Sequence, residues 1–111
     1  MAQLFEDLAN LDRLIHEPAR LSILTALSAC QGADFLFLQR LTGLTAGNLS
    51  SHLNKLQEAG LLQVEKAFIG KRPNTNVQIT EKGLQAVDSH WKRLEELRKG
   101  ATEWKPGDPS G

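Results

Sequence analysis

Apolar residues recur at helical spacing in the first third of this chain. A helix over about 2–15 is predicted by one stripe with spacings of four, three and four residues: Leu4, Leu8, Leu11 and Ile15. Pro18 ends that helix and suits the first turn of the next one. The segment 18–29 is apolar on more than one side, which predicts a central core helix.

The apolar run 34–38 is ambiguous, because periodicity alone cannot assign so short a run. Phe35 can belong to a short strand that pairs with a later hairpin, and a helix then starts near Leu36. Gly43 is placed to stop that helix.

The clearest helix signals bracket the segment 45–60. Thr45 is the predicted N-cap, and Leu44 and Leu49 stand at the hydrophobic-staple positions on either side of it. Gly60 is the predicted left-handed C-cap. The inward stripe consists of Leu49, Leu53 and Leu56.

Alternating apolar and polar residues then predict two strands, 62–68 and 76–80, joined by a long loop over 69–75. Thr80 caps a last helix, which carries a second apolar stripe: Leu84, Val87, Trp91 and Leu94. The segment 100–111 is rich in Gly, Pro and Ser, which predicts a flexible tail after a single domain over 1–99. The fold class is mainly α with a small β-hairpin, with about five helices and a wing sheet of two or three strands.

The composition indicates the number of domains, the class of protein and the distribution of charge. The length of 111 residues suggests one domain, and no apolar run approaches the ~20 residues of a membrane helix. The single cysteine, Cys30, cannot form an internal disulfide, so a reduced, cytoplasmic protein is expected, with Cys30 as buried packing. The net charge is zero, but residues 1–17 carry −3 and residues 18–80 carry +3. The basic excess lies where the two central helices and the hairpin are predicted.

The outer face of the 45–60 helix has the chemistry of a base-reading surface. With the leucine stripe inward, the face is short, polar and free of acids until Glu58. Asn48 can pair bidentately with adenine, Ser51 is a permissive donor or acceptor, and Gly47 leaves the helix N-terminus open to a phosphate. A merely solvated surface fits the same residues about equally well on this helix alone.

A cationic hairpin tip favours the nucleic-acid interpretation. Lys71 and Arg72 adjoin Pro73 in the predicted loop, and arginine can enter a minor groove or bind phosphate at two points. Lys66, Asn74 and Thr75 can add backbone contacts. A solubilising tip is the competing interpretation.

Several segments in fixed order resemble small bacterial and archaeal winged-helix regulators of the MarR/ArsR-like group, over about residues 11–97. They are 11–21, 43–56, 58–61, 70–75 and 80–84. The resemblance implies a winged helix-turn-helix transcription factor whose recognition helix begins at Thr45, with Lys71 and Arg72 in the wing. It also implies a homodimer formed by the first and last helices, and the two apolar stripes support that independently.

The expected function is therefore sequence-specific binding of double-stranded DNA, by a homodimeric repressor that reads a palindromic operator with the helix at 45–59 and the wing at 69–75. The predicted DNA contacts are Thr45, Gly47, Asn48, Ser50, Ser51, His52, Asn54, Lys55, Lys71, Arg72, Asn74 and Thr75. The predicted dimer interface is Leu4, Leu8, Leu11, Ile15, Leu84, Val87, Trp91 and Leu94.

Other functions have weaker support. The alternative is a winged-helix protein-interaction module or assembly subunit that does not bind DNA, which the zero net charge favours. No enzyme, cofactor or metal site is expected, because Cys30, His16, His52 and His90 are scattered and no nucleophile–base motif is present. A small-molecule effector would have to bind at the dimer interface.

Overall fold

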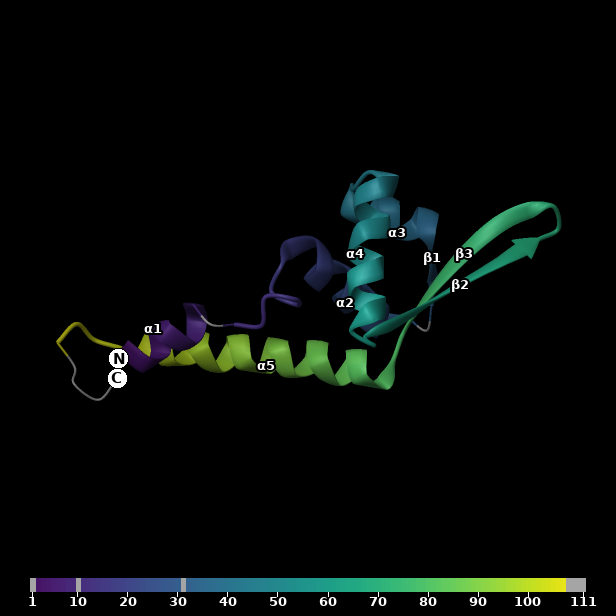
Figure 1. Cartoon of the computed structure of the whole chain (residues 1–111). Coiled ribbons are helices and arrows are strands. Elements are labelled where there is room, and N and C mark those ends of the chain that lie inside the picture. Colours follow the sequence, from purple (N-terminus) through teal and green to yellow (C-terminus); the bar gives the residue numbers. More distant parts are fainter. Residues whose placement is uncertain (1, 10, 31, 108–111) are drawn as a thin grey trace.

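The computed structural model describes residues 2–9, 11–30 and 32–107, and this part of the chain forms five helices and one antiparallel three-stranded sheet (Figure 1). The elements in chain order are α1 (Ala2–Ala9), α2 (Pro18–Ala29), β1 (Ala33–Asp34), α3 (Phe35–Thr42), α4 (Ala46–Glu58), β2 (Leu62–Ile69), β3 (Arg72–Ile79) and α5 (Glu81–Glu103). The strand order is β1-β3-β2. The predicted fold class is confirmed.

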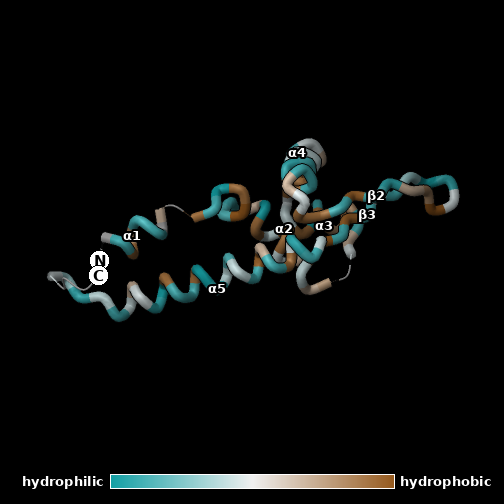
Figure 2. Tube along the Cα trace, turned by 60° about the horizontal axis from the view of Figure 1, so that its bottom comes forward, coloured by the Kyte–Doolittle hydropathy of each residue, from teal (hydrophilic) through white to brown (hydrophobic). Residues whose placement is uncertain are grey.

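The molecule is elongated, with extents of 65 × 26 × 21 Å. Helices α2, α3 and α4 form a body with the base of the sheet, and the β2–β3 hairpin extends from that body to one side. Helix α5 runs past the body in the opposite direction, and its far half lies beside α1 (Figures 1 and 2). The hairpin and this α1–α5 arm therefore occupy opposite ends of the molecule.

Helix α4 has the predicted start and end. The Thr45 hydroxyl accepts a hydrogen bond from the Asn48 N–H at 3.2 Å, which caps the first turn. Gly60 has a φ of +78°, and the N–H groups of Gly60 and Leu61 donate to the carbonyls of Gln57 and Leu56. This pair of bonds is a Schellman motif, which satisfies carbonyls that the helix end would leave free.

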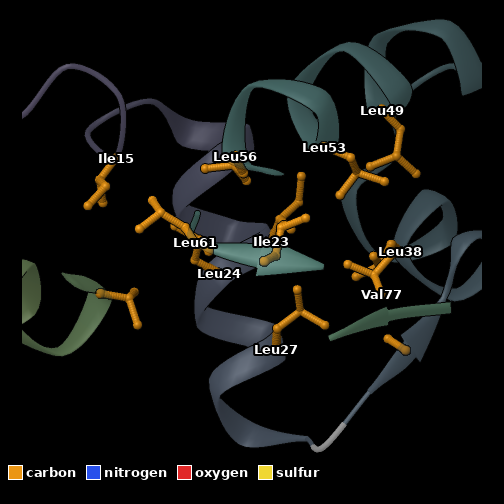
Figure 3. Packing of buried hydrophobic residues seen from close by; sticks show 13 residues of the cluster. Ile15, Ile23, Leu24, Leu27, Leu38, Leu49, Leu53, Leu56, Leu61 and Val77 are labelled. Atoms are coloured by element: carbon orange, nitrogen blue, oxygen red, sulfur yellow. The ribbon is translucent and has the colours of Figure 1, made fainter. Parts of the chain in front are cut away.

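The core lies between α4, α2 and the sheet. The inward stripe Leu49, Leu53 and Leu56 faces α2, as Figure 3 shows. The α2 residues Ile23, Leu24 and Leu27 are fully buried, together with Leu38 of α3 and Val77 of β3. This packing fixes the rotation of α4, so its polar face must point away from the body.

The first helix is shorter than predicted, because α1 ends at Ala9 and not near Ile15. The Asp12 carboxylate accepts from the Leu14 N–H at 2.9 Å, and the Asp12 carbonyl accepts from the His16 N–H. A short acidic side chain that binds nearby backbone in this way competes with a helix. Ile15 consequently leaves the α1 stripe and is buried in the main core at 4% exposure.

The strand before α3 also differs in position. Ala33 and Asp34 pair with Val77 and Asn76 of β3, and the helix begins at Phe35. The Asp34 carboxylate caps α3 by accepting from the Phe37 N–H at 2.7 Å, which explains the earlier start. Gly43 ends the helix with a φ of +70°, as predicted.

The hairpin has longer strands and a shorter turn than the predicted loop 69–75. The two strands pair continuously from Leu62 with Ile79 to Ile69 with Arg72, which leaves Gly70 and Lys71 as the turn. Gly70 has a φ of +65°, the sign that a type II′ turn needs at its first central position. Pro73 is tolerated in β3 because, within the described residues, β1 bonds to that strand only farther along.

The start of α5 is bound to the corner between α4 and β2. Thr80 caps α5 by accepting from the Gly83 N–H, and its own hydroxyl donates to the Gly60 carbonyl at 2.6 Å. Lys82 Nζ donates to the Ala59 carbonyl at 2.9 Å. Helix α5 then continues past the predicted domain limit at residue 99 to Glu103.

Two contacts hold α1 against the far half of α5. Arg93 and Asp7 form an ion pair at 2.7 Å, and the rings of Phe5 and Trp104 pack edge to face.

Candidate nucleic-acid interface

The outer face of α4 is open to solvent over its whole length. Of the predicted contacts on this helix and at its cap, seven side chains or backbone positions are exposed: Thr45, Gly47, Asn48, Ser50, Ser51, Asn54 and Lys55. A Cβ added at Gly47 would meet no heavy atom within 4 Å, so the N-terminal turn is accessible. Free N–H groups in that turn can bind a phosphate oxygen, because they lie at the positive end of the helix dipole.

The hairpin contributes the cations. Lys66, Lys71 and Arg72 are exposed, whereas Asn74 and Thr75 are half-buried. Lys71 occupies the turn, and Arg72 pairs with Ile69 at the end of the two strands. The predicted cationic tip is therefore split between a turn residue and the first residue of β3.

A cleft joins α4 to the hairpin. It is lined by Ser50 and Asn54 from the helix and by Lys66 and Thr75 from the hairpin, with Phe35, Leu53 and Val64 as its apolar part. Lys66 and Thr75 are opposite each other in the β2–β3 register, so their side chains lie on one face of the sheet. The polar face of α4 and one face of the hairpin thus form a continuous surface.

His52 does not belong to this free surface. It is half-buried, and its Nδ1 lies 3.1 Å from Arg20 NH1 and 3.8 Å from Glu17 Oε2. A guanidinium can only donate, so Nδ1 accepts from Arg20, and the longer separation from Glu17 is not a hydrogen bond. Arg20 also donates to the Leu14 carbonyl at 2.6 Å. His52 thereby connects α4 to the start of α2.

Glu17 stabilises the same junction as the N-cap of α2. Burial raises the pKa of its carboxyl, but hydrogen bonds from the Arg20 and Ala19 N–H groups and the electrostatic influence of the nearby His52 and Arg20 side chains outweigh burial, so the pKa is lowered. Glu17 consequently stays ionised, with its carboxylate accepting from the Arg20 backbone N–H at 2.8 Å. The sequence Glu17–Pro18 carries a local signal for this helix start, because an acceptor side chain before a proline is typical of an N-cap. The approach of His52 to Glu17 could not be found in this way, because the two residues lie on separate elements.

The predicted dimer residues divide into two groups. Ile15 and Val87 are buried inside one chain at 4% and 2% exposure, so they are core residues, which corrects their assignment to an interface. Leu84 and Trp91 are exposed, and three others are half-buried: Leu4, Leu11 and Leu94. The side chain of Leu8 lies outside the described part of the structure. The remaining interface candidates still share the α1–α5 side of the molecule.

Trp91 is the largest of these exposed apolar side chains. Its indole N–H donates to the Thr25 hydroxyl of α2 at 3.0 Å, which fixes the ring across a shallow cleft. That cleft is almost wholly apolar and includes Leu21 of α2 and Leu41 of α3. A large apolar surface of this kind is typical of a protein–protein contact.

Other predicted chemistry is dispersed. Cys30 is exposed, with its thiol donating to the Ala26 carbonyl, which corrects its assignment as buried packing. It follows the last turn of α2, where the chain leaves the core.

Within the described residues, no three His, Cys, Asp or Glu side chains converge on a metal position. None of the described helices combines the length and the apolar character that crossing a membrane requires.

Comparisons with known proteins agree with this geometry. A family model described as "Winged helix DNA-binding domain" matches residues 19–98. The uncharacterized protein MJ0432 of Methanocaldococcus jannaschii is 32% identical over 87 residues, which make up 78% of this chain and 95% of that protein.

Two solved structures are similar over most of the chain. A transcriptional regulator homologue from Pyrococcus horikoshii OT3 shares 32% identity with a TM-score of 0.79, covering 91% of this chain and 98% of that one. A MarR-family transcriptional regulator from Silicibacter pomeroyi shares the fold at 22% identity, with a TM-score of 0.64, over 98% of this chain and 69% of its own.

Proposed function

This chain belongs to the winged helix DNA-binding domain family, and from that premise we propose that it is a homodimeric transcriptional repressor that reads a palindromic operator. A DNA-binding transcriptional regulator is the function that its family and its similarity to the Pyrococcus horikoshii OT3 regulator homologue support. The dimer, the palindrome and the sign of regulation are the proposal.

The observation that carries the proposal is the continuous surface of α4 and the hairpin. The cleft residues Ser50 and Asn54 lie on the helix, and Lys66 and Thr75 lie beside them on the hairpin. Most outward side chains of the helix are short, and no acid occurs from Thr45 to Gln57. The helix can therefore approach the negatively charged major groove closely. The hairpin then lies over the adjacent backbone.

The contacts have separate tasks. Asn48, Ser51 and Asn54 bind base edges, because amide and hydroxyl groups can both donate and accept there. Lys55, Lys71 and Arg72 bind phosphates and hold the register of the protein on the duplex. The phosphate contacts supply affinity that falls with salt, whereas the base contacts supply sequence preference.

Dimerisation through the α1–α5 side explains the exposed Trp91 and Leu84. A two-fold dimer presents one α4 from each chain, so the operator should contain inverted half-sites about one turn, roughly 34–36 Å, apart. Covering a promoter with such a dimer would exclude polymerase and repress transcription.

The test is selection of bound duplexes from genomic fragments, followed by sequencing. A recovered palindrome with half-sites one turn apart supports the proposal, and the Arg72→Ala protein under the same conditions is the matched control for wing-dependent retention. Retention of no duplex at low salt, together with one stoichiometric protein partner in a pull-down, would instead support the protein-interaction alternative.

A further inference from the structure

The tip of the hairpin carries two large apolar side chains with little protein around them. Phe68 is 74% exposed and Ile69 is 68% exposed, the highest values among the large hydrophobic residues in the described part of the chain. Figure 2 shows the hydrophobic segment near the end of the hairpin. Neighbouring exposed apolar residues at the end of a projecting element suggest a contact surface.

Phe68 lies on the same side of the hairpin as the cleft residues. Alternate residues of a strand share a face, so Phe68 follows Val64 and Lys66, which line the cleft with α4. Pro73 is directly opposite Phe68 in the register and extends the apolar surface. The ring is therefore presented on the face of the hairpin that continues the polar face of α4.

The length of the hairpin places this ring one groove away from α4. Phe68 lies four positions beyond Val64, which lines the cleft with α4, and the turn at Gly70 lies six positions beyond it. At about 3.3 Å per residue these offsets are roughly 13 Å and 20 Å. The centre of a minor groove lies about half a helical turn, roughly 17 Å, from the centre of the adjacent major groove. A helix seated in the major groove thus brings the tip to the minor groove.

The charges around the tip select a polyanion as its occupant. The hairpin segment 62–79 carries three cations, Lys66, Lys71 and Arg72, against one acid, Glu65. Lys66 shares the hairpin face of Phe68, and Lys71 and Arg72 lie beyond the ring at the tip, with Arg72 on the opposite face. An apolar ring with cations around it matches the minor groove, which has sugar and base surfaces inside and phosphates at its rims.

We propose that Phe68 enters the minor groove of the operator flank as an apolar wedge and partly opens one base step, while Arg72 holds a bordering phosphate. This role rests on the proposed DNA-binding function and adds a specificity determinant to it. Opening a step costs least at flexible pyrimidine–purine steps, so Phe68 makes the protein prefer such a step at a position that α4 never touches.

The first test compares wild type, Phe68→Ser and Phe68→Leu on the duplex recovered by selection. Phe68→Ser should weaken binding about tenfold, because the apolar contact is lost, and Phe68→Leu should restore part of it. The slope of log affinity against log salt should stay unchanged, because no charge is removed. Leu36→Ser, a similarly exposed apolar residue on α3, is the matched control and should bind like wild type.

The second test places 2-aminopurine at successive positions of the flank, because its fluorescence rises on unstacking. Wild type should raise the signal at one step, and Phe68→Ser should not. Equal affinity of wild type and Phe68→Ser, or an unchanged fluorescence signal with wild type, overturns the wedge and leaves DNA binding intact. If the wild-type protein binds no duplex, both the DNA-binding proposal and the wedge are overturned. If Phe68→Ser fails to self-associate in the absence of DNA, the ring belongs to a protein contact and the wedge is overturned.

Discussion

His16 Nδ1 lies 3.2 Å from His90 Nε2, so two imidazole rings connect the segment before α2 to the middle of α5. One ring must donate and the other accept, which requires that at least one of them is neutral. Burial of His90 lowers its pKa, the nearby His16 lowers it further, and Asp12 acts in the opposite direction. Asp7, Arg93 and Asp12 line the pocket beside the His90 ring.

This pair predicts loss of stability in mild acid. The folded protein binds a proton at His90 less readily than the unfolded chain, so the contribution of His90 is fully present above the ordinary pKa of about 6.5. Stability should fall as the pH decreases below that value towards the lowered folded pKa. Thermal unfolding between pH 8 and pH 5 measures the effect, and His90→Gln should reduce the pH slope. An unchanged slope in that variant would contradict the prediction.

Arg72→Ala should weaken binding to all duplexes similarly. Arg72 ends β3 beside the turn and is proposed to bind phosphate, so its loss should lower the slope of log affinity against log salt by about one. Titrations at several salt concentrations measure that slope. Lys105→Ala removes the same charge at the opposite end of the molecule, and a comparable change in that variant would argue against a wing contact.

Asn48→Ala should change sequence preference more than general affinity. Asn48 is exposed in the first turn of α4, where a bidentate contact with a base discriminates by about 1–3 kcal/mol. Binding to a panel of duplexes with single base changes measures the discrimination. Ser51→Ala should act in the same way, whereas Gln57→Ala, near the other end of α4, should keep the wild-type preference.

Gly83→Ala should destabilise the fold by about 1–3 kcal/mol through overpacking. A Cβ at Gly83 would overlap the Leu61 carbonyl oxygen and lie 2.7 Å from Ile79 Cγ1, so α5 would have to move away from the α4–β2 corner. Gly47→Ala is the matched control, because its Cβ has open space and alanine favours a helix by roughly 0.5–1 kcal/mol. Denaturant unfolding of both variants measures the difference, and equal stabilities would contradict the packing argument.

Trp91→Ser should weaken self-association about thirtyfold, because a central tryptophan commonly contributes about 2 kcal/mol or more to an interface. The ring is 42% exposed in a single chain, so its replacement should leave the fold intact. Sedimentation over a range of protein concentrations measures the dimer fraction. Gln85→Ala, on an exposed position of the same helix, should behave like wild type.

Local signals predicted the elements whose boundaries depend on a few neighbouring residues. Thr45, Gly60 and Thr80 act at the helix ends where they were expected, because capping bonds form within one turn. The polar face of α4 also follows directly from its leucine stripe. The exposure of seven of its predicted contacts is consistent with the sequence-based site, although their binding to DNA stays a prediction.

The remaining differences arise from contacts between distant segments. Ile15 continues a helical stripe in sequence, but the Asp12 turn and the core redirect it. His52 is polar on a polar helix, and its burial depends on Arg20, 32 residues earlier. The Gly70–Lys71 turn extends both strands through residues that resemble a loop, because pairing across the hairpin outweighs the turn propensity of Pro73 and Asn74.

A single residue, Thr80, separates the last strand of the hairpin from the long helix α5. The hairpin and α5 are both bound to the corner between α4 and β2. In the proposed dimer, a small rotation of α5 about the two-fold axis would therefore displace the hairpin tip by a larger distance than it displaces the base of the hairpin. The short connection through Thr80 thus fixes the distance between the two wings of such a dimer. The proposed dimer should therefore accept few changes in operator spacing, and inserting one base pair between the half-sites should prevent both wings from binding at once.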